Sequence, residues 1–187
     1  MIDPRVTLKA LAVAALAFYA TSPSAQELSD DPEVLLDQLA DEADPAEGAR
    51  LAAEVLERWS HSGSAAMDLL LRRAQDAMAD DDYVRAVAHL TALTDHAPDF
   101  AEGWNKRAEA FFMMEQYGAA LTDIEQALIL QPRHFGAWAG LGIMLDRMDR
   151  KDAALRAFRR AEELYPAEEN VAGAVERLEL ETGGRTL

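Results

Sequence analysis

Few side chains in this sequence have the chemistry of a catalytic or metal-binding site. Cysteine is absent and histidine occurs four times in 187 residues, which excludes disulfides, thiolate metal sites and cysteine nucleophiles. His89 and His96 stand seven residues apart, too far to share one metal ion on a single helix without other ligands. We therefore expect surface or half-buried histidines, with no metal and no cofactor.

Two short clusters come closest to a reactive arrangement. Ser60, His61 and Ser62 place hydroxyl groups beside an imidazole, but no nucleophile elbow and no glycine run for an oxyanion hole accompany them. The run 80–82 is all aspartate but lacks the glycine and the later glutamate of a calcium-binding loop, and carboxylates are favourable at a helix start. These clusters predict a loop and a helix start, and we expect no enzymatic activity.

The composition restricts the partners. The 34 acidic and 18 basic side chains give a formal net charge of −16, which repels phosphate backbones and anionic membrane surfaces. Half of the residues are hydrophobic, enough for a buried core. Nucleic acid is therefore not expected as a partner.

Residues 1–25 have the layout of a secretory signal peptide. Arg5 and Lys9 precede an apolar run over 10–20, and small residues follow it. This run has 11 residues, whereas a membrane-spanning helix needs about 20. We expect cleavage near Ser24 or Ala25, a periplasmic or secreted mature chain, and no stable membrane insertion after cleavage. An uncleaved anchor helix is the alternative.

Three prolines reveal an internal repeat, because Pro98, Pro132 and Pro166 are spaced by 34 residues. When the three windows are superposed, apolar residues coincide at several positions. The matching sets are Leu70, Trp104 and Trp138; Ala74, Ala108 and Gly142; Ala77, Phe111 and Leu145; Ala86, Ala120 and Ala154; and Leu90, Ile124 and Phe158. Each window carries two apolar stripes of helical period, and the proline ends the second helix.

This period and this pattern resemble the tetratricopeptide repeat. The resemblance implies an all-α, right-handed solenoid of helix-turn-helix units, with repeats at 67–100, 101–134 and 135–168. Many repeats of that family have glycine in the turn between the two helices, where this chain has Asp81, Glu115 and Asp149.

The flanks of the three repeats are also expected to be helical. Residues 26–65 predict an acidic segment with a degenerate, repeat-like helix pair, which we interpret as a fourth, N-terminal repeat over 32–61. Residues 169–182 predict a C-terminal capping helix, followed by a flexible tail at 183–187. The spacing of Asp99 and Glu102 predicts a capping box, and Ser64 is the expected cap of the first repeat.

The resemblance also implies a concave groove, lined by the first helix of each repeat, that holds a partner peptide or helix. The expected contacts are Leu71, Arg72, Gln75, Met78, Asn105, Lys106, Glu109, Phe112, Met113 and Ile143. The third repeat adds Gly136, Ala139, Gly140, Asp146 and Arg147 at the corresponding places. Met78, Phe112 and Met113 have a second interpretation, as packing against neighbouring helices, but Phe111 already fills the core stripe beside Phe112.

The carboxylate clamp of chaperone-binding tetratricopeptide domains is not matched. Its lysine, asparagine and arginine places hold Leu71, Gln75, Lys106, Gly136 and Gly140 here. We expect a periplasmic protein-interaction module that supports envelope protein assembly, a role that rests on the compartment alone.

The alternatives are a self-associating scaffold and, less favoured, a small-ligand binder or enzyme, which would need a deep pocket. Self-association is suggested by the charge distribution. Residues 27–47 hold nine acidic and no basic side chains, whereas residues 147–160 are rich in arginine. The simpler interpretation is a solvated face with pairs such as Arg159 and Glu163.

Overall fold

The computed structural model describes residues 32–183, and these residues are helical apart from short turns and loops, with no strand among them. In chain order the helices are α2 (Pro32–Asp41), α3 (Pro45–Trp59), α4 (Ala65–Ala79), α5 (Tyr83–His96), α6 (Ala101–Met113), α7 (Tyr117–Leu130), α8 (Phe135–Arg147), α9 (Lys151–Leu164) and α10 (Glu169–Gly183). The predicted all-α solenoid is confirmed.

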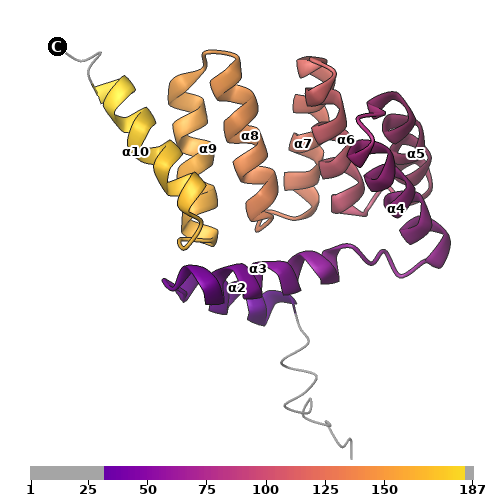
Figure 1. Ribbon diagram of the computed structural model, residues 1–187, viewed down its shortest axis with the longest axis horizontal. Helices are drawn as coiled ribbons and strands as arrows, with labels where there is room; N and C mark the ends of the chain where they lie inside the picture. Colours follow the sequence, from indigo (N-terminus) through magenta and orange to yellow (C-terminus); the bar gives the residue numbers. More distant parts are fainter. Residues whose placement is uncertain (1–31, 184–187) are drawn as a thin grey trace, which may run out of the picture.

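The helix pairs α4–α5, α6–α7 and α8–α9 stand side by side in chain order, and α10 follows α9 (Figure 1). Within a pair, a small residue on the first helix lets a large one on the second approach. Ala108 shares a core cluster with Ile124. In the third pair Phe158 is larger, and a Cβ added at Gly142 would lie 2.8 Å from its ring. Only glycine leaves room for that ring.

The turns inside the three repeats have the same conformation. Asp81, Glu115 and Asp149 have φ angles of 59°, 58° and 57°, the left-handed region in which glycine is usual. Each turn closes its helix with paired amide hydrogen bonds, as where Gln116 donates to the carbonyl of Phe111 at 2.9 Å. A left-handed conformation at a non-glycine residue lowers the free energy of unfolding by about 1 kcal/mol at each of these positions.

The helix starts differ from the expected caps. Asp82 does cap α5 by accepting the amide of Arg85, but the predicted box at Asp99 and Glu102 is wrong, because Phe100 is the N-cap residue of α6. Ser64 is the N-cap residue of α4, but its side chain makes no cap hydrogen bond.

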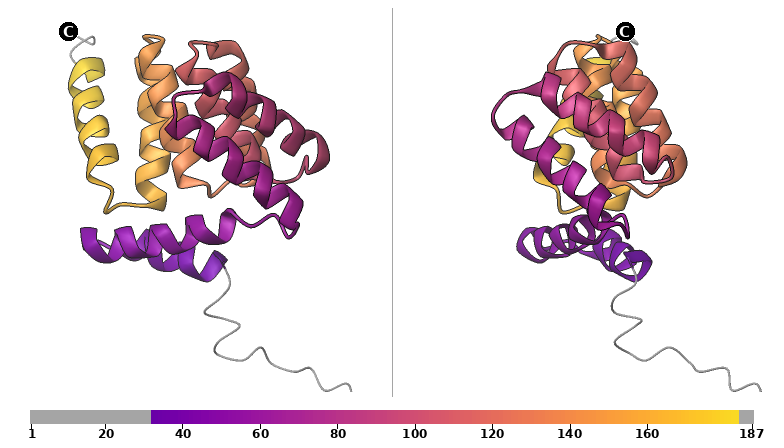
Figure 2. Two further views of the ribbon diagram at one scale, coloured as in Figure 1. Left: turned by 45° about the vertical axis from the view of Figure 1, so that its right-hand side comes forward. Right: turned by 90° about the vertical axis from the view of Figure 1, so that its right-hand side faces the viewer.

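The first helix pair does not continue the stack. Helices α2 and α3 lie crosswise beneath the lower ends of α8, α9 and α10 instead of packing against α4 (Figures 1 and 2). Leu36, Leu39 and Val55 are fully buried there, in one core cluster with Leu164 and Tyr165 of the third repeat. We call α2–α3 the N-terminal strap. The expected fourth stacked repeat is therefore corrected to a helix pair that covers one edge of the solenoid.

The leading face of a repeat, the side of its first helix that meets the preceding repeat, explains this placement. In the second and third repeats this face is apolar, and Ala110 and Met144 are 0% and 3% exposed. The equivalent residue of the first repeat is Asp76, which is exposed, and Leu69 on the same face is 40% exposed. Covering Asp76 with an apolar helix would bury an unpaired carboxylate. The strap therefore packs elsewhere.

The predicted signal peptide, residues 1–25, lies outside the described residues. Among the helices that the structure describes, none is long and apolar enough to cross a membrane.

Candidate functional site

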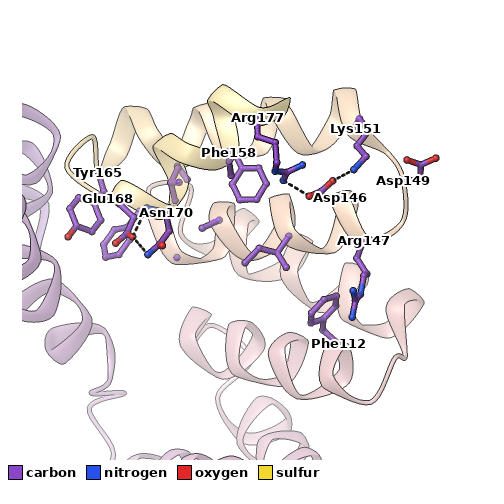
Figure 3. A pocket seen from close by; sticks show the side chains of 17 residues that line it. Phe112, Asp146, Arg147, Asp149, Lys151, Phe158, Tyr165, Glu168, Asn170 and Arg177 are labelled. Atoms are coloured by element: carbon purple, nitrogen blue, oxygen red, sulfur yellow. Dashed lines mark hydrogen bonds and ion pairs between the residues drawn. The ribbon is translucent and has the colours of Figure 1, made fainter. Parts of the chain in front are cut away.

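A cavity of about 940 Å³ lies between α8 and α10, with α9 behind it and Phe112 of α6 at one end (Figure 3). Its lining is mainly apolar and includes Phe112, Phe135, Ala139, Ile143, Phe158, Ala161, Tyr165, Val171 and Ala174. Ile143 is 50% exposed. A volume of this size suits one or two large apolar side chains of a partner, or one small ligand.

Small residues on the exposed face of α8 make room for this cavity. Gly136 and Ala139 line it, whereas the equivalent places of the second repeat hold Glu102 and Asn105. A Cβ added at Gly136 would meet only atoms of His134, at 3.5 Å. The space over α8 is therefore open because the residues are small, and larger side chains would enter it.

Ion pairs close the end of the cavity at the C-terminus of α8. Asp146 accepts hydrogen bonds from Lys151 Nζ and from an Arg177 guanidinium nitrogen, both at 2.6 Å, and Arg177 also pairs with Glu181 at 2.9 Å. Burial raises the pKa of Asp146, but the hydrogen bonds from Lys151 and Arg177 outweigh burial and hold the pKa below its ordinary value. This cluster ties α8, α9 and α10 together.

Arg147 lines the same end of the cavity, toward Phe112 (Figure 3). Its side chain is exposed and pairs with no carboxylate among residues 32–183. An arginine beside an apolar surface can bind a partner's carboxylate or backbone carbonyl.

The predicted contacts of the second repeat are already paired with one another. Lys106 Nζ lies 2.9 Å from Glu109 and 4.0 Å from Glu102, and Asn105 donates to Glu102 at 2.9 Å. Burial lowers the pKa of Lys106, but the carboxylates of Glu102 and Glu109 outweigh burial and raise it. A partner would have to replace these interactions to use this part of the groove.

The remaining predicted contacts fall into three groups. Leu71 is 1% exposed and packs in the core of the first repeat, which corrects its assignment to the groove surface. It shares this core with Leu90 of α5 and Ala110 of α6. Met78 is half-buried against the same core. Arg72 and Gln75 are exposed on α4, away from the cavity.

Of the apolar contacts predicted on α6, only one lines the cavity. Phe112 is half-buried, with its ring 5.7 Å from that of Tyr117, and reaches the cavity. Met113 is 51% exposed but does not line it. Ile143 of α8 joins Phe112 at the cavity. The structure thus brings two of the ten principal contacts together, Phe112 and Ile143. Four of the five further positions predicted on the third repeat, Gly136, Ala139, Asp146 and Arg147, line the same cavity.

Sequence reasoning missed the contributions of α9 and α10. Phe158, Val171, Ala174 and Arg177 line the cavity, whereas the family resemblance implies groove contacts only on the first helices of the repeats. The signal was present in part, since α10 occupies the place of a fourth first helix after the third repeat.

The Ser60–His61 cluster lies at the end of α3. Both side chains bond to the carbonyl of Glu57, and Ser60 Oγ lies 3.3 Å from His61 Nδ1. No group of three or more metal-ligating side chains occurs within the described part of the chain.

His134 corrects the expectation of surface or half-buried histidines, because it is 1% exposed. Its Nδ1 accepts the amide of Ala137 at 3.1 Å, so Nε2 carries the hydrogen that faces Glu102 at 3.0 Å. The hydrogen bond between His134 and Glu102 links the N-cap of α8 to α6.

The basic last repeat is paired differently from the expectation. Arg159 pairs with Glu179 of α10 at 2.7 Å, and Glu163 pairs instead with Arg160. The acidic N-terminal segment is also paired within the same chain, because Glu33 and Asp37 of the strap form ion pairs with Arg133.

Comparison with known proteins decides the family. No family model matches the chain. A TPR repeat-containing protein of Rhizobium etli is 35% identical over 163 residues, which cover 84% of this chain and 80% of that relative. The chain belongs to the tetratricopeptide repeat family. The 34-residue period and the helix pairs of this tetratricopeptide repeat protein agree with that assignment.

Solved structures share the fold at low identity. The first TPR domain of Spaghetti bound to an HSP90 peptide is 18% identical, with a TM-score of 0.62, and covers 64% of this chain and 98% of that domain. MamA is 19% identical, with a TM-score of 0.60, and covers 79% of this chain and 84% of MamA.

Proposed function

We propose that this tetratricopeptide repeat protein is an interaction module that binds a partner peptide or helix on its concave face, with the cavity between α8 and α10 as the main contact. The observation that carries the proposal is the apolar cavity of about 940 Å³ beside Arg147. An apolar side chain of the partner would enter the cavity, and a nearby carboxylate or carbonyl would bind Arg147.

The comparison with Spaghetti supports peptide binding as a use of this scaffold, since that domain is bound to an HSP90 peptide. The residues of this chain favour a different mode of binding. The clamp places are held by residues such as Leu71 and Gly136, and Lys106 is paired internally. Apolar contact in the cavity would therefore contribute more to affinity than a charged clamp in the first two repeats.

A pull-down from the native cell envelope tests this proposal, with a matched pair of exposed isoleucines. Ile143 lines the cavity and is 50% exposed, whereas Ile129 lies on α7 outside it and is 72% exposed. We expect a partner that is retained by the wild type and by Ile129→Glu, and that is depleted at least tenfold by Ile143→Glu. Equal recovery with all three baits, or no enrichment over background, would contradict the proposal. Circular dichroism checks that both variants remain folded.

The proposed compartment is the periplasm, in support of envelope protein assembly. The pattern of residues 1–25 supports export, since a basic start, a short apolar run and small residues precede the acidic segment. Mass spectrometry of the protein isolated from cells tests this: a mature N-terminus after Ser24 or Ala25 in the periplasmic fraction is expected. An intact N-terminus in the cytosolic fraction would reject export.

A small amphiphile is the second candidate ligand, favoured by the volume of the cavity, which lies in the range of small-molecule sites. Native mass spectrometry distinguishes a bound small molecule from a bound peptide. A small molecule that co-purifies with the wild type and is lost in Ile143→Glu would favour this candidate over a peptide.

A further inference from the structure

The strap is joined to one repeat and packed on another. Residues 60–64 connect α3 to α4 of the first repeat, while the apolar side of the strap lies on the third repeat (Figures 1 and 2). The strap therefore covers a surface formed by residues about one hundred positions later in the sequence. The strap of a second chain could therefore make the same contacts with this surface.

The strap makes specific contacts with the third repeat and with the turn that precedes α8. The ring of Trp59 lies 4.5 Å from that of His134 and 5.6 Å from that of Phe135, measured between centroids. Arg133 bonds to the carboxylates of Glu33 at 2.9 Å and Asp37 at 2.7 Å. The interface therefore combines ring contacts with charge complementarity.

Close backbone contact makes the same interface selective for the strap. At Gly48 an added Cβ would lie 2.8 Å from the Cβ of Ala167 and 3.0 Å from the ring of Tyr165. Glycine thus lets α3 approach the turn that follows α9. The third repeat and the strap are fitted to each other.

The connection at 60–64 is held by a few local bonds. The Ser62 amide and hydroxyl both donate to Asp68 Oδ1, at 2.8 and 2.6 Å. Gly63 has a φ of +80° and no other group within 4 Å of an added Cβ. These features fix the direction of α4 relative to α3. A different backbone conformation at 62–64 would place the strap away from the third repeat of its own chain.

We propose that the strap is an exchangeable element whose other partner is a second copy of this chain. Two chains dock their straps on each other's third repeat, which forms a reciprocal, two-fold dimer with the contacts seen within one chain. The leading face of the first repeat cannot receive the strap, because Asp76 lies on it. Among the described residues, the third repeat is thus the surface that fits the strap.

The first experiment changes the length of the connection in the full chain of 20.5 kDa. Deleting residues 61–63 prevents the reversal, so light scattering after gel filtration should show a doubled mass. Adding Leu36→Asp to the deletion puts a charge in the buried face of the strap and should restore the monomer. A deletion variant that stays monomeric, or a dimer that survives Leu36→Asp, would overturn the proposal.

The second experiment keeps the natural connection and uses the absence of cysteine. A Gly48→Cys chain and a differently tagged Ala167→Cys chain are mixed at high concentration and oxidised. Exchange predicts a disulfide between the two tags, which Ala53→Cys, on the exposed side of α3, does not form with Ala167→Cys.

A hinge variant supplies a third measurement in case cysteine at position 48 disturbs the interface. Asp68→Ala removes the two hydrogen bonds that Ser62 donates to Asp68. It should raise the association constant for dimer formation of the otherwise wild-type chain about tenfold. No mixed disulfide together with no change for Asp68→Ala would reject exchange. Mass and disulfide formation are measured on the purified protein alone, so the failure of exchange is distinguishable from the failure of partner binding.

Discussion

The two ends of the solenoid are finished in different ways. At the N-terminal end the first repeat leaves its leading face in solvent, with Asp76 exposed and Leu69 40% exposed. At the C-terminal end α10 packs on α9, and the strap covers the lower edge, where Leu164 and Tyr165 are buried. The difference shows that a helix pair packs where an apolar surface is available, even when that surface is not its neighbour in the sequence.

The largest expected effect comes from exchanging residues at equivalent leading-face positions. Met144→Asp should cost about 3–5 kcal/mol in the free energy of unfolding, because it buries an unpaired carboxylate between the second and third repeats. Asp76→Met should change that free energy by less than about 0.5 kcal/mol, because this face is in solvent. Urea denaturation measures both. Similar costs for the two variants would mean that the first repeat is also covered.

A matched pair of leucines compares the two ends directly. Leu164 is 4% exposed at the contact with the strap, so Leu164→Ala should destabilise the protein by about 2–4 kcal/mol. Leu69→Ala on the exposed end should cost less than about 1 kcal/mol. If the two midpoints in urea shift equally, the strap contributes little to the C-terminal end.

Glycine positions test the tightness of packing in the third repeat. Gly142→Ala should destabilise by about 1–3 kcal/mol, because its Cβ would lie 2.8 Å from the ring of Phe158. Gly118 has no group within 4 Å of an added Cβ, so Gly118→Ala should stabilise α7 by about 0.5–1 kcal/mol. Thermal unfolding should show shifts of opposite sign, and shifts of the same sign would argue against this packing.

The smallest expected effect is the pH dependence of the C-terminal end. Because the pKa of Asp146 is lowered in the folded chain, its ion pairs contribute stability above about pH 4 that is lost as the pH falls through the lowered pKa. The loss should be under about 1 kcal/mol. Thermal unfolding at pH 7 and pH 3 measures it, with Asp146→Asn as the control that should respond less. An equal response of both proteins would assign the effect to other carboxylates.

The repeat period predicted the helix pairs because identical spacing repeats the same contacts. The period also located the turns at Asp81, Glu115 and Asp149, but their left-handed conformation did not follow from it, because glycine, the usual residue there, is missing. The position of the strap did not follow, because an apolar stripe shows that a helix is buried but not what it contacts. Asp76, polar where Ala110 and Met144 are buried, was the signal that the first repeat receives no neighbour.

The candidate site was predictable in part. Phe112 and Ile143 were found from their places on first helices. The wall formed by α10 was not, because 169–182 was predicted as a capping helix, and groove contacts were expected from the first helices of the three repeats alone. Lys106 was correctly placed on α6, but its pairing with Glu109 depends on rotamers that a sequence pattern does not contain.

The strap also changes how the chain has to fold. In a repeat array, contacts join neighbours in sequence, so folding can begin anywhere and spread by short steps. The bond between Arg133 and Glu33 joins residues 100 positions apart, and closing so long a loop costs entropy that local helix pairing does not. Docking of the strap is therefore expected as the late, slow step, after which the two ends of the array no longer unravel independently.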